Sequence, residues 1–504
     1  MKQIKIVFYS TIVCMASLFV LPGCNNSSDK PADATSAKVK DIPVSTSSKE
    51  AKSAFRDGLS SFDLGETKKA KAAFTKAIGL DSTLGIAYLY RSNLSNSSKE
   101  FADDINAGKS HLDSASDWEK MYGEYQVATL SGDRKKQVEI IEKIASTYPE
   151  AARAQVDLSA VYTGNNQLDK ARACAQKATE LDPKWPGGFA ALATSYLFSD
   201  PKDTKKAEEN ALKVVELAPN SPGAEILLGD CYRAQNDMQK AKDAYAKAVT
   251  LDPESPNAYS KEGNANTFLG NMDEARKNYL DGSTHAVDAK TGYLVTTAYT
   301  YLYANGDYKT AEKTLMDGVA KVDAAGKGAT AEKNNLLTTA AAIAFHYNDA
   351  ATLKQLVPMI TPLTEQLNND LGTPEGKAFT KADVANWQAM IAIQEGKFDE
   401  AKAKVEEIKT DLDAIKDDRK LESYYFLKGM ISMKQKNYAD AVTNFGKSDL
   451  NNQIYNKYWL AMANEAAGNK DKAMSLYKEV AAYNFNDVGN AMVRMEAKKK
   501  VATP

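Results

Sequence analysis

The stretch Leu227–Pro253, with the sequence LLGDCYRAQNDMQKAKDAYAKAVTLDP, decides the fold. Apolar residues recur at helical spacing on both sides of the polar turn QNDM, so each half is predicted to be an amphipathic helix. Pro253 ends the second helix, because proline has no backbone N–H and its ring clashes with the preceding turn. The stretch is therefore predicted to form one pair of antiparallel helices.

The pattern of this stretch recurs along the chain. Three positions are occupied by an identical residue 34 positions later: Gly229 and Gly263, Ala241 and Ala275, and Tyr245 and Tyr279. A fixed period of this length is the signature of a repeat protein. The glycine lets the second helix approach closely, the alanine lies at the crossing, and the tyrosine fills the gap between the helices. Because one pair cannot bury both of its faces, neighbouring pairs must stack into a superhelix.

These positions resemble the tetratricopeptide repeat. The match is best between residues 150 and 285 and is recognisable in most of residues 52–483, although the tryptophan of the family pattern is absent from these copies. The resemblance implies an all-α protein built as a right-handed α-solenoid of about ten helix pairs. It also implies that the first helix of each pair lines a concave groove, where such proteins receive a partner.

The repeats are not equally regular along the chain. Residues 96–150 are helical in pattern but divergent, and the period lengthens later, since Ala311 and the matching Ala401 lie 90 residues apart. The predicted units are an N-terminal array at 49–319, a degenerate repeat with long loops at 320–380, a C-terminal array at 381–483, and a basic capping helix and tail at 484–504.

The first residues are predicted to be removed from the mature protein. Lys2 and Lys5 precede an apolar run, which is typical of a signal peptide over residues 1–23. Leu21-Pro22-Gly23-Cys24 resembles the lipobox of bacterial lipoproteins, with proline as an unusual occupant of the second position. The resemblance implies acylation of Cys24, anchorage in a lipid bilayer of the cell envelope and, because asparagine follows the cysteine, the outer membrane. An ordinary signal peptide with a chance cysteine is the alternative.

A tether is predicted to follow the lipid anchor. Residues 24–48 contain few large apolar side chains, so they cannot bury enough surface to offset the entropy of ordering. We expect this segment to be a disordered linker between the bilayer and the repeats.

No motif in the sequence points to catalysis. His111, His285 and His346 lie far apart without Cys, Asp or Glu at ligand spacing, so no metal site is predicted. Nucleophile-elbow, phosphate-loop and zinc-protease motifs are absent, and we expect neither enzymatic activity nor a cofactor. A net charge of −2 gives no positive field for a nucleic-acid partner. Cys174 and Cys231 form a disulfide or remain two buried thiols.

The candidate partner groove consists of the side chains that the repeat register points toward the concave face. The middle repeats offer polar groups and tyrosines, and residues 382–465 are rich in methionine and aromatic residues, which suit adaptable apolar recognition. The candidates are Asp230, Arg233, Asn264, Tyr293, Tyr303, Met390, Phe426, Met430, Met433, Tyr455, Tyr458 and Met462. The alternative is that these side chains pack against neighbouring repeats or the chain's own capping helix.

One specialised groove is excluded by the residues present. The clamp with which chaperone-binding tetratricopeptide domains hold a terminal carboxylate needs lysines and asparagines at set positions. Asn264 occupies one such position, but Ser260 and Thr297 replace a lysine and an asparagine.

Together these features predict a membrane-tethered scaffold or adaptor that binds a protein or peptide partner in its concave groove. The alternative is a solute- or glycan-binding envelope lipoprotein whose tyrosines stack against sugar rings. Such lipoproteins usually carry large loop-rich insertions, whereas this chain spends most of its length on repeats. A stoichiometric protein partner would favour the scaffold, and a bound glycan would favour the alternative.

Overall fold

The computed structural model describes residues 40–95, 97–199, 201–286, 292–325, 329–370, 372–417, 419–448 and 453–502. Every regular element within these ranges is an α-helix, which confirms the predicted all-α class. The predicted signal peptide, Cys24 and the first part of the predicted tether lie outside the described residues.

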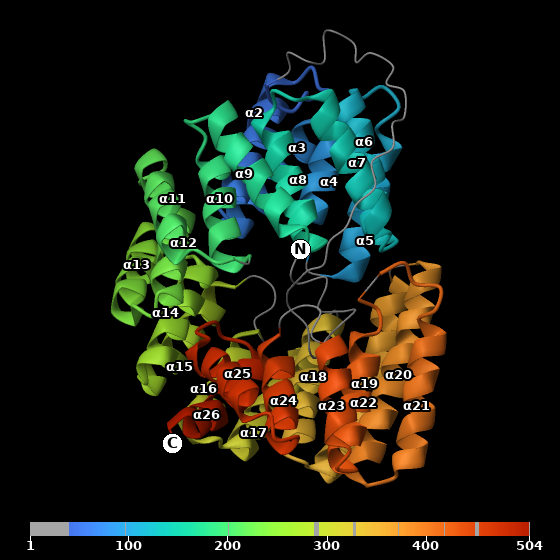
Figure 1. The fold of residues 1–504 in the computed structure, drawn as a ribbon. Helices are drawn as coiled ribbons and strands as arrows, with labels where there is room; N and C mark the ends of the chain where they lie inside the picture. The colour runs from blue at the N-terminus through green and yellow to red at the C-terminus, as the bar shows by residue number, and fades with distance from the viewer. Residues whose placement is uncertain are drawn as a thin grey trace.

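The helices follow one another as twelve antiparallel pairs and a final single helix (Figure 1). The pairs are α2 (Lys49–Asp63) with α3 (Thr67–Leu80), α4 (Gly85–Ser92) with α5 (Ser98–Ser110), α6 (Asp117–Leu130) with α7 (Arg134–Thr147), α8 (Ala152–Gly164) with α9 (Leu168–Leu181), α10 (Pro186–Phe198) with α11 (Thr204–Leu217), α12 (Pro222–Ala234) with α13 (Met238–Leu251), α14 (Pro256–Leu269) with α15 (Met272–His285), α16 (Gly292–Asn305) with α17 (Tyr308–Ala325), α18 (Thr330–His346) with α19 (Ala350–Asp370), α20 (Pro374–Gln394) with α21 (Phe398–Asp411), α22 (Glu422–Lys434) with α23 (Tyr438–Ser448), and α24 (Ile454–Ala466) with α25 (Lys470–Ala482). The last helix is α26 (Val488–Ala502).

The described residues thus contain more pairs than the sequence predicted. The region predicted to be divergent, residues 96–150, contains three helices, of which α6 pairs with α7, while α5 pairs with α4 from before the region. Helix α4 has only eight residues, which is too short to display a helical period in the sequence.

The glycine and aromatic positions of the repeat pack as predicted. A Cβ atom placed on Gly229 would lie 2.4 Å from Cε1 of Tyr245, and one on Gly263 would lie 2.6 Å from Cε1 of Tyr279. Both tyrosines are fully buried. The glycine is therefore required because the ring of the second helix occupies the space of its missing side chain.

The turns inside the pairs account for the short connections. Asn236 adopts a positive φ of 67° between α12 and α13, and Asn166 does the same between α8 and α9. Asparagine tolerates this left-handed conformation better than most residues. The next helix begins at once, since Asp237 accepts a hydrogen bond from the backbone N–H of Lys240.

The degenerate region differs from its prediction. The residues expected to form long loops between 320 and 380 lie mostly in long helices, because α19 and α20 each have 21 residues and only a short connection joins them. Pro358 and Pro362 lie inside α19, which explains why the sequence pattern looked interrupted.

The predicted tether also ends earlier than residue 48. Ile42 and Val44 are buried in the same core cluster as the first repeats. The backbone N–H of Ser45 donates to Oε1 of Glu119 at 3.0 Å, and Ser48 caps α2. Two apolar side chains and a capping serine are enough to dock this short segment, although its composition is mostly polar.

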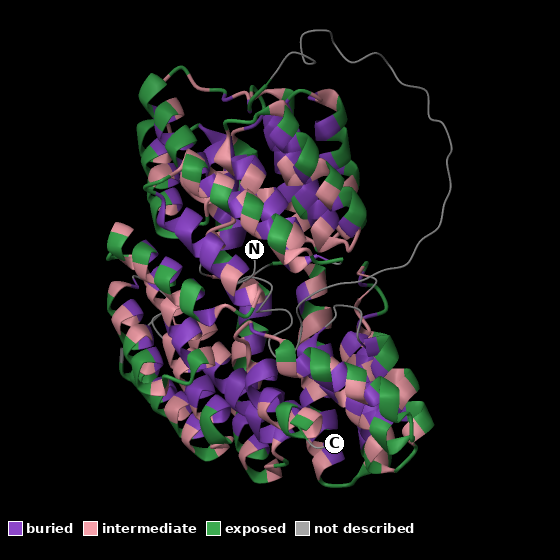
Figure 2. Ribbon diagram, turned by 60° about the vertical axis from the view of Figure 1, so that its left-hand side comes forward, coloured by how far each residue is buried: buried purple, intermediate pink, exposed green. Residues whose placement is uncertain are grey.

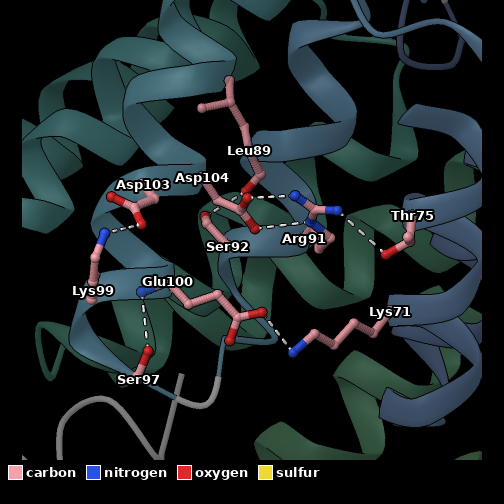
Figure 3. Close-up of polar contacts among 10 residues, drawn as sticks. All are labelled: Lys71, Thr75, Leu89, Arg91, Ser92, Ser97, Lys99, Glu100, Asp103 and Asp104. Atoms are coloured by element: carbon pink, nitrogen blue, oxygen red, sulfur yellow. Dashed lines mark hydrogen bonds and ion pairs between the residues drawn. The ribbon is translucent and has the colours of Figure 1, made fainter. Parts of the chain in front are cut away.

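Polar contacts tie α3, α4 and α5 together on the surface of the first repeats (Figure 3). Arg91 forms a bidentate pair with Asp104, with nitrogen–oxygen distances of 2.6 and 3.0 Å. Lys71 and Glu100 form an ion pair at 2.7 Å. The Arg91 contact lies within the pair α4 and α5, and the Lys71 contact joins this pair to the one before it, in a region where the repeat pattern is weak.

Helices α2 to α12 curl until the first pair meets the fourth, fifth and sixth pairs. Asp63 at the end of α2 pairs with Arg153 of α8, and both side chains are buried. The Nε1 atom of Trp185 donates to Asp63 at 3.1 Å, and Ser221 Oγ at the start of α12 donates to Glu66 at 2.5 Å. This half of the array therefore closes on itself, and Figure 2 shows its buried residues gathered inside and its exposed residues outside.

Candidate partner-binding surface

The first helices of the pairs form the inner side of the array. From α8 to α20, each first helix contacts the first helix of the next pair in addition to its own partner. Helices on the inner side of a curved stack approach one another more closely than those outside. The predicted concave groove should therefore be formed by the inner faces of the first helices, among them α12, α14, α16, α18 and α24.

Residues at the end of the chain occupy this inner side. Helix α26 contacts α16, α18 and α24 as well as α25, and in Figure 1 it lies beside α16. The predicted capping helix thus folds back across the first helices instead of only covering the last pair. Residues 483–487, which connect α25 to α26 without regular secondary structure and which we name the strap, reach α12 and α14.

The predicted apolar groove at residues 382–465 is filled by the chain itself. Its most apolar candidates are nearly inaccessible and belong to the largest core cluster: Met390, Phe426, Met430, Tyr455 and Tyr458. Met433 and Met462 are half-buried and pack against the same cluster. These side chains therefore pack in the way the alternative described, against neighbouring repeats and α26.

One polar contact with α26 and one between α18 and α24 fill this region. Tyr458 donates its hydroxyl hydrogen to Glu496 of α26, and the Tyr455 hydroxyl lies 3.3 Å from Nδ1 of His346. Burial lowers the pKa of His346 to about 4, so the imidazole is neutral near pH 7.

The polar candidates of α12 form a buried network. Asp230 accepts hydrogen bonds from Tyr245 at 2.6 Å and from Lys261 at 2.6 Å, and Arg233 lies 3.2 Å from the same carboxylate. Burial alone would raise the pKa of Asp230, but Lys261 and Arg233 outweigh it and hold that pKa below its ordinary value. Asp230 is therefore a buried, ionised carboxylate that pairs with Arg233 and is not exposed on the groove.

Of the remaining candidates, one contacts the strap and two pack against neighbouring helices. Asn264 accepts a hydrogen bond from Asn486 of the strap. Tyr303 is buried with its ring centre 5.5 Å from that of Phe268, and Tyr293 is half-buried against Gly282. Burial raises the pKa of Tyr293 to about 12.

The strap contributes residues that the sequence did not single out. Asn484 Nδ2 donates to Oδ1 of Asn236 at 2.7 Å, and the Phe485 ring centre lies 4.2 Å from the guanidinium carbon of Arg233. Asn486 Nδ2 donates to Oδ1 of Asn264 at 2.7 Å. In the sequence, the only indication of the strap is that Tyr483–Asp487 is polar and aromatic at the point where the next repeat would otherwise begin.

A separate surface hollow of about 660 Å³ opens between α19, α20 and α21. Thr361, Lys381, Gln388, Glu406 and Asp411 are among the residues that line it. None of the predicted groove residues lines this hollow.

The cysteines, possible metal ligands and helix lengths bear on the remaining sequence predictions. Cys174 and Cys231 are free thiols. Within the described ranges, no group of His, Cys, Asp and Glu is arranged to hold a metal ion. The helices of this part of the chain include none that is long and apolar enough to cross a bilayer.

The comparisons with known proteins bear on the repeats. Models of the tetratricopeptide repeat match residues 51–84, 152–184, 226–255 and 455–484. These matches include α2 with α3, α8 with α9, most of α12 with α13, and α24 with α25. No curated protein matches the chain.

Several solved structures have a similar arrangement of helices. A tetratricopeptide protein of Thermus thermophilus is 18% identical with a TM-score of 0.32, covering 35% of this chain and 94% of its own. A tetratricopeptide repeat protein of Parabacteroides merdae is 11% identical with a TM-score of 0.34, covering 58% of this chain and 99% of its own. The Cut9–Hcn1 hetero-tetramer of the APC/C is 13% identical with a TM-score of 0.40, covering 89% of this chain and 76% of that one.

Because these identities and TM-scores are low, the assignment of the repeats depends on the family-model matches. Tetratricopeptide repeats suggest a protein-interaction scaffold, and no enzyme family is among the matches. The chain therefore contains tetratricopeptide repeats at its beginning, middle and end, within an array of helix pairs.

Proposed function

We propose that the protein is a non-catalytic scaffold that binds an extended segment of a partner protein on the inner face of its repeats. The observation that carries this proposal is the seating of the strap. A segment without regular secondary structure lies on α12 and α14, and consecutive side chains make separate contacts with the array. Repeat arrays hold extended peptides by this kind of side-chain contact.

The same observation argues for a protein ligand over a sugar. The groups that meet the strap are amides and a guanidinium, which are suited to the amide and aromatic side chains of a peptide. The buried tyrosines of the inner face, such as Tyr303 and Tyr458, have no free ring face to offer a sugar.

The test is capture of the partner from envelope membranes. The full-length chain carrying an affinity tag is cross-linked in its own cells and purified. We expect one protein to be recovered in a fixed ratio to the bait, and a Lys177→Ala variant on the exposed face of α9 to recover it equally. Recovery of no protein in a fixed ratio, together with binding to a glycan array, would replace the scaffold with the glycan-binding alternative.

We propose further that acylated Cys24 tethers the array to the outer membrane. The support is the lipobox-like sequence before Cys24, and several acyl chains would anchor a protein stably where a single chain would not. Cys24→Ala should move the protein from the membrane fraction to the soluble fraction. Retention of that variant in the membrane would contradict the lipid anchor, and separation of inner from outer membranes would test the location.

A further inference from the structure

The strap is held on the array by three successive side chains. Asn484 meets Asn236 in the turn after α12, Phe485 lies over Arg233 of α12, and Asn486 meets Asn264 of α14. Phe485 also lies with its ring centre 5.1 Å from that of Phe198 in α10. The contact surface therefore extends over three consecutive pairs of the array.

The receiving groups are positioned by their own repeats. The Tyr279 hydroxyl donates to Oδ1 of Asn264 at 2.9 Å and lies 3.0 Å from Oγ1 of Thr267. Asn236 is fixed in a turn whose backbone hydrogen bonds join α12 to α13. A ligand therefore meets groups that already have their bound orientation, which reduces the entropy lost on binding.

The strap leaves part of this surface unsatisfied. Arg233 is only 3% exposed, and its Nε and Nη1 atoms have no hydrogen-bond partner among the described residues. The Oδ1 atom of Asn486 is likewise buried without a partner in the part of the chain that the structure describes. A buried donor without an acceptor is unfavourable, so a ligand with an oxygen atom beside Arg233 would bind better than the strap does.

We infer that Arg233, Asn236, Asn264 and Tyr279 form a peptide-binding surface that the strap covers until a partner displaces it. The partner presents an extended segment in which an aromatic residue lies between two asparagine or similar amide side chains, with an oxygen acceptor for Arg233. This inference rests on the proposed function. It adds which surface binds the partner, which side chains the partner presents, and how the strap controls access to that surface.

The strap competes strongly because it belongs to the same chain. Short flexible connections give effective concentrations in the millimolar range. The strap is also held in its bound form from the other side, since Arg494 donates to the carbonyl of Tyr483 at 3.1 Å and Asn490 donates to that of Phe485 at 2.9 Å. A separate peptide with the same side chains therefore cannot displace it at micromolar concentration.

The experiment measures binding of a labelled peptide with the sequence of residues 482–487, AYNFND, to the purified full-length chain by fluorescence anisotropy. Phe485→Ala with Asn486→Ala in the chain removes two of the strap's three side-chain contacts and should tighten binding of the peptide at least tenfold over the wild type. Lys478→Ala, on the exposed face of α25, should leave binding at the wild-type level.

A second change tests the surface itself. Asn236→Gly removes the amide that meets Asn484, and glycine accepts the positive φ of this turn without strain. Added to the strap variant, it should weaken peptide binding at least fivefold. If circular dichroism shows that the double strap variant is unfolded, Asn486→Ala alone replaces it, with a smaller gain expected in the same direction.

Three outcomes overturn the inference: equal binding to the wild type and the strap variant, no binding to either at millimolar peptide, or no effect of Asn236→Gly. If one of these occurs while the cross-linked partner is still recovered, the scaffold function stands and the partner binds elsewhere. If no partner is recovered at all, the proposed function fails first.

Discussion

The guanidinium carbon of Arg233 lies 4.2 Å from the centre of the Phe485 ring, which joins the sixth helix pair to the segment before the last helix. The same guanidinium lies 3.2 Å from the buried carboxylate of Asp230. Arg233 therefore has a charged partner within its own helix and an aromatic partner from the end of the chain.

Arg233→Lys should destabilise the protein by about 2 kcal/mol, because a lysine ammonium lacks the flat guanidinium that stacks on Phe485 and pairs with Asp230. Urea denaturation at pH 7 measures the change. Lys240→Ala, an exposed change in the first turn of α13, is the control and should alter stability by less than about 0.5 kcal/mol. An equally small change for Arg233→Lys would show that the stack contributes little.

Gly229→Ala should destabilise the protein by about 1–3 kcal/mol, because the new methyl group would lie 2.4 Å from the Tyr245 ring and force it aside. Gly446→Ala is the matched control, since it also lies inside a helix but has no atom within 4 Å of the added Cβ. There the change should stabilise the protein by up to about 1 kcal/mol through helix propensity. Thermal unfolding of the two variants should therefore shift in opposite directions.

Asp63→Ala should cost about 3–5 kcal/mol, because it leaves the Arg153 guanidinium buried without its carboxylate. Burial raises the pKa of Asp63 in spite of Arg153, which indicates that the pair is costly to bury. The double change Asp63→Leu with Arg153→Met should consequently recover most of the loss, apart from the acceptor that Trp185 loses. A double-mutant cycle measures the coupling, and additive losses would argue against a buried pair.

His346 should make stability depend on pH. Its pKa is about 4 in the folded protein and 6.5 in an unfolded chain, so below pH 6.5 the unfolded state binds a proton that the folded state does not. As the pH falls from about 6.5 to 4, the folded state loses up to about 3 kcal/mol from this group. His346→Phe should remove that loss, so its stability relative to the wild type should rise between pH 7 and pH 4.5. A constant difference between the two proteins would show that His346 titrates normally.

The local unit of the fold could be predicted from the sequence because it depends on short-range spacing. Gly229 and Tyr245 lie 16 residues apart, and their contact follows from the geometry of a single helix pair. The family-model matches to the tetratricopeptide repeat confirm the predicted repeat unit.

The contents of the inner face could not be predicted in the same way. Whether α26 reaches α16 or only covers α25 depends on the curvature of the array, which accumulates from small rotations between pairs. The register identified Arg233 and Tyr458 as inward-facing and left open whether they pack against the capping helix, but it could not identify Phe485 and Glu496 as their partners. The docking of Ile42 and Val44 was missed for a related reason, because two apolar residues do not alter the composition of a polar segment.

Contacts between distant pairs also change how the array should respond to unfolding. Arg134 at the start of α7 pairs with Asp417 at 2.8 Å, Lys416 reaches Asp133 at 3.0 Å, and α5 touches α19. An open stack in which each pair touches only its neighbours can lose pairs one after another from its ends. In this array, ion pairs between distant helix pairs must break before either end can unfold. Pulling on the two termini should therefore give one large unfolding force instead of a series of small unfolding steps.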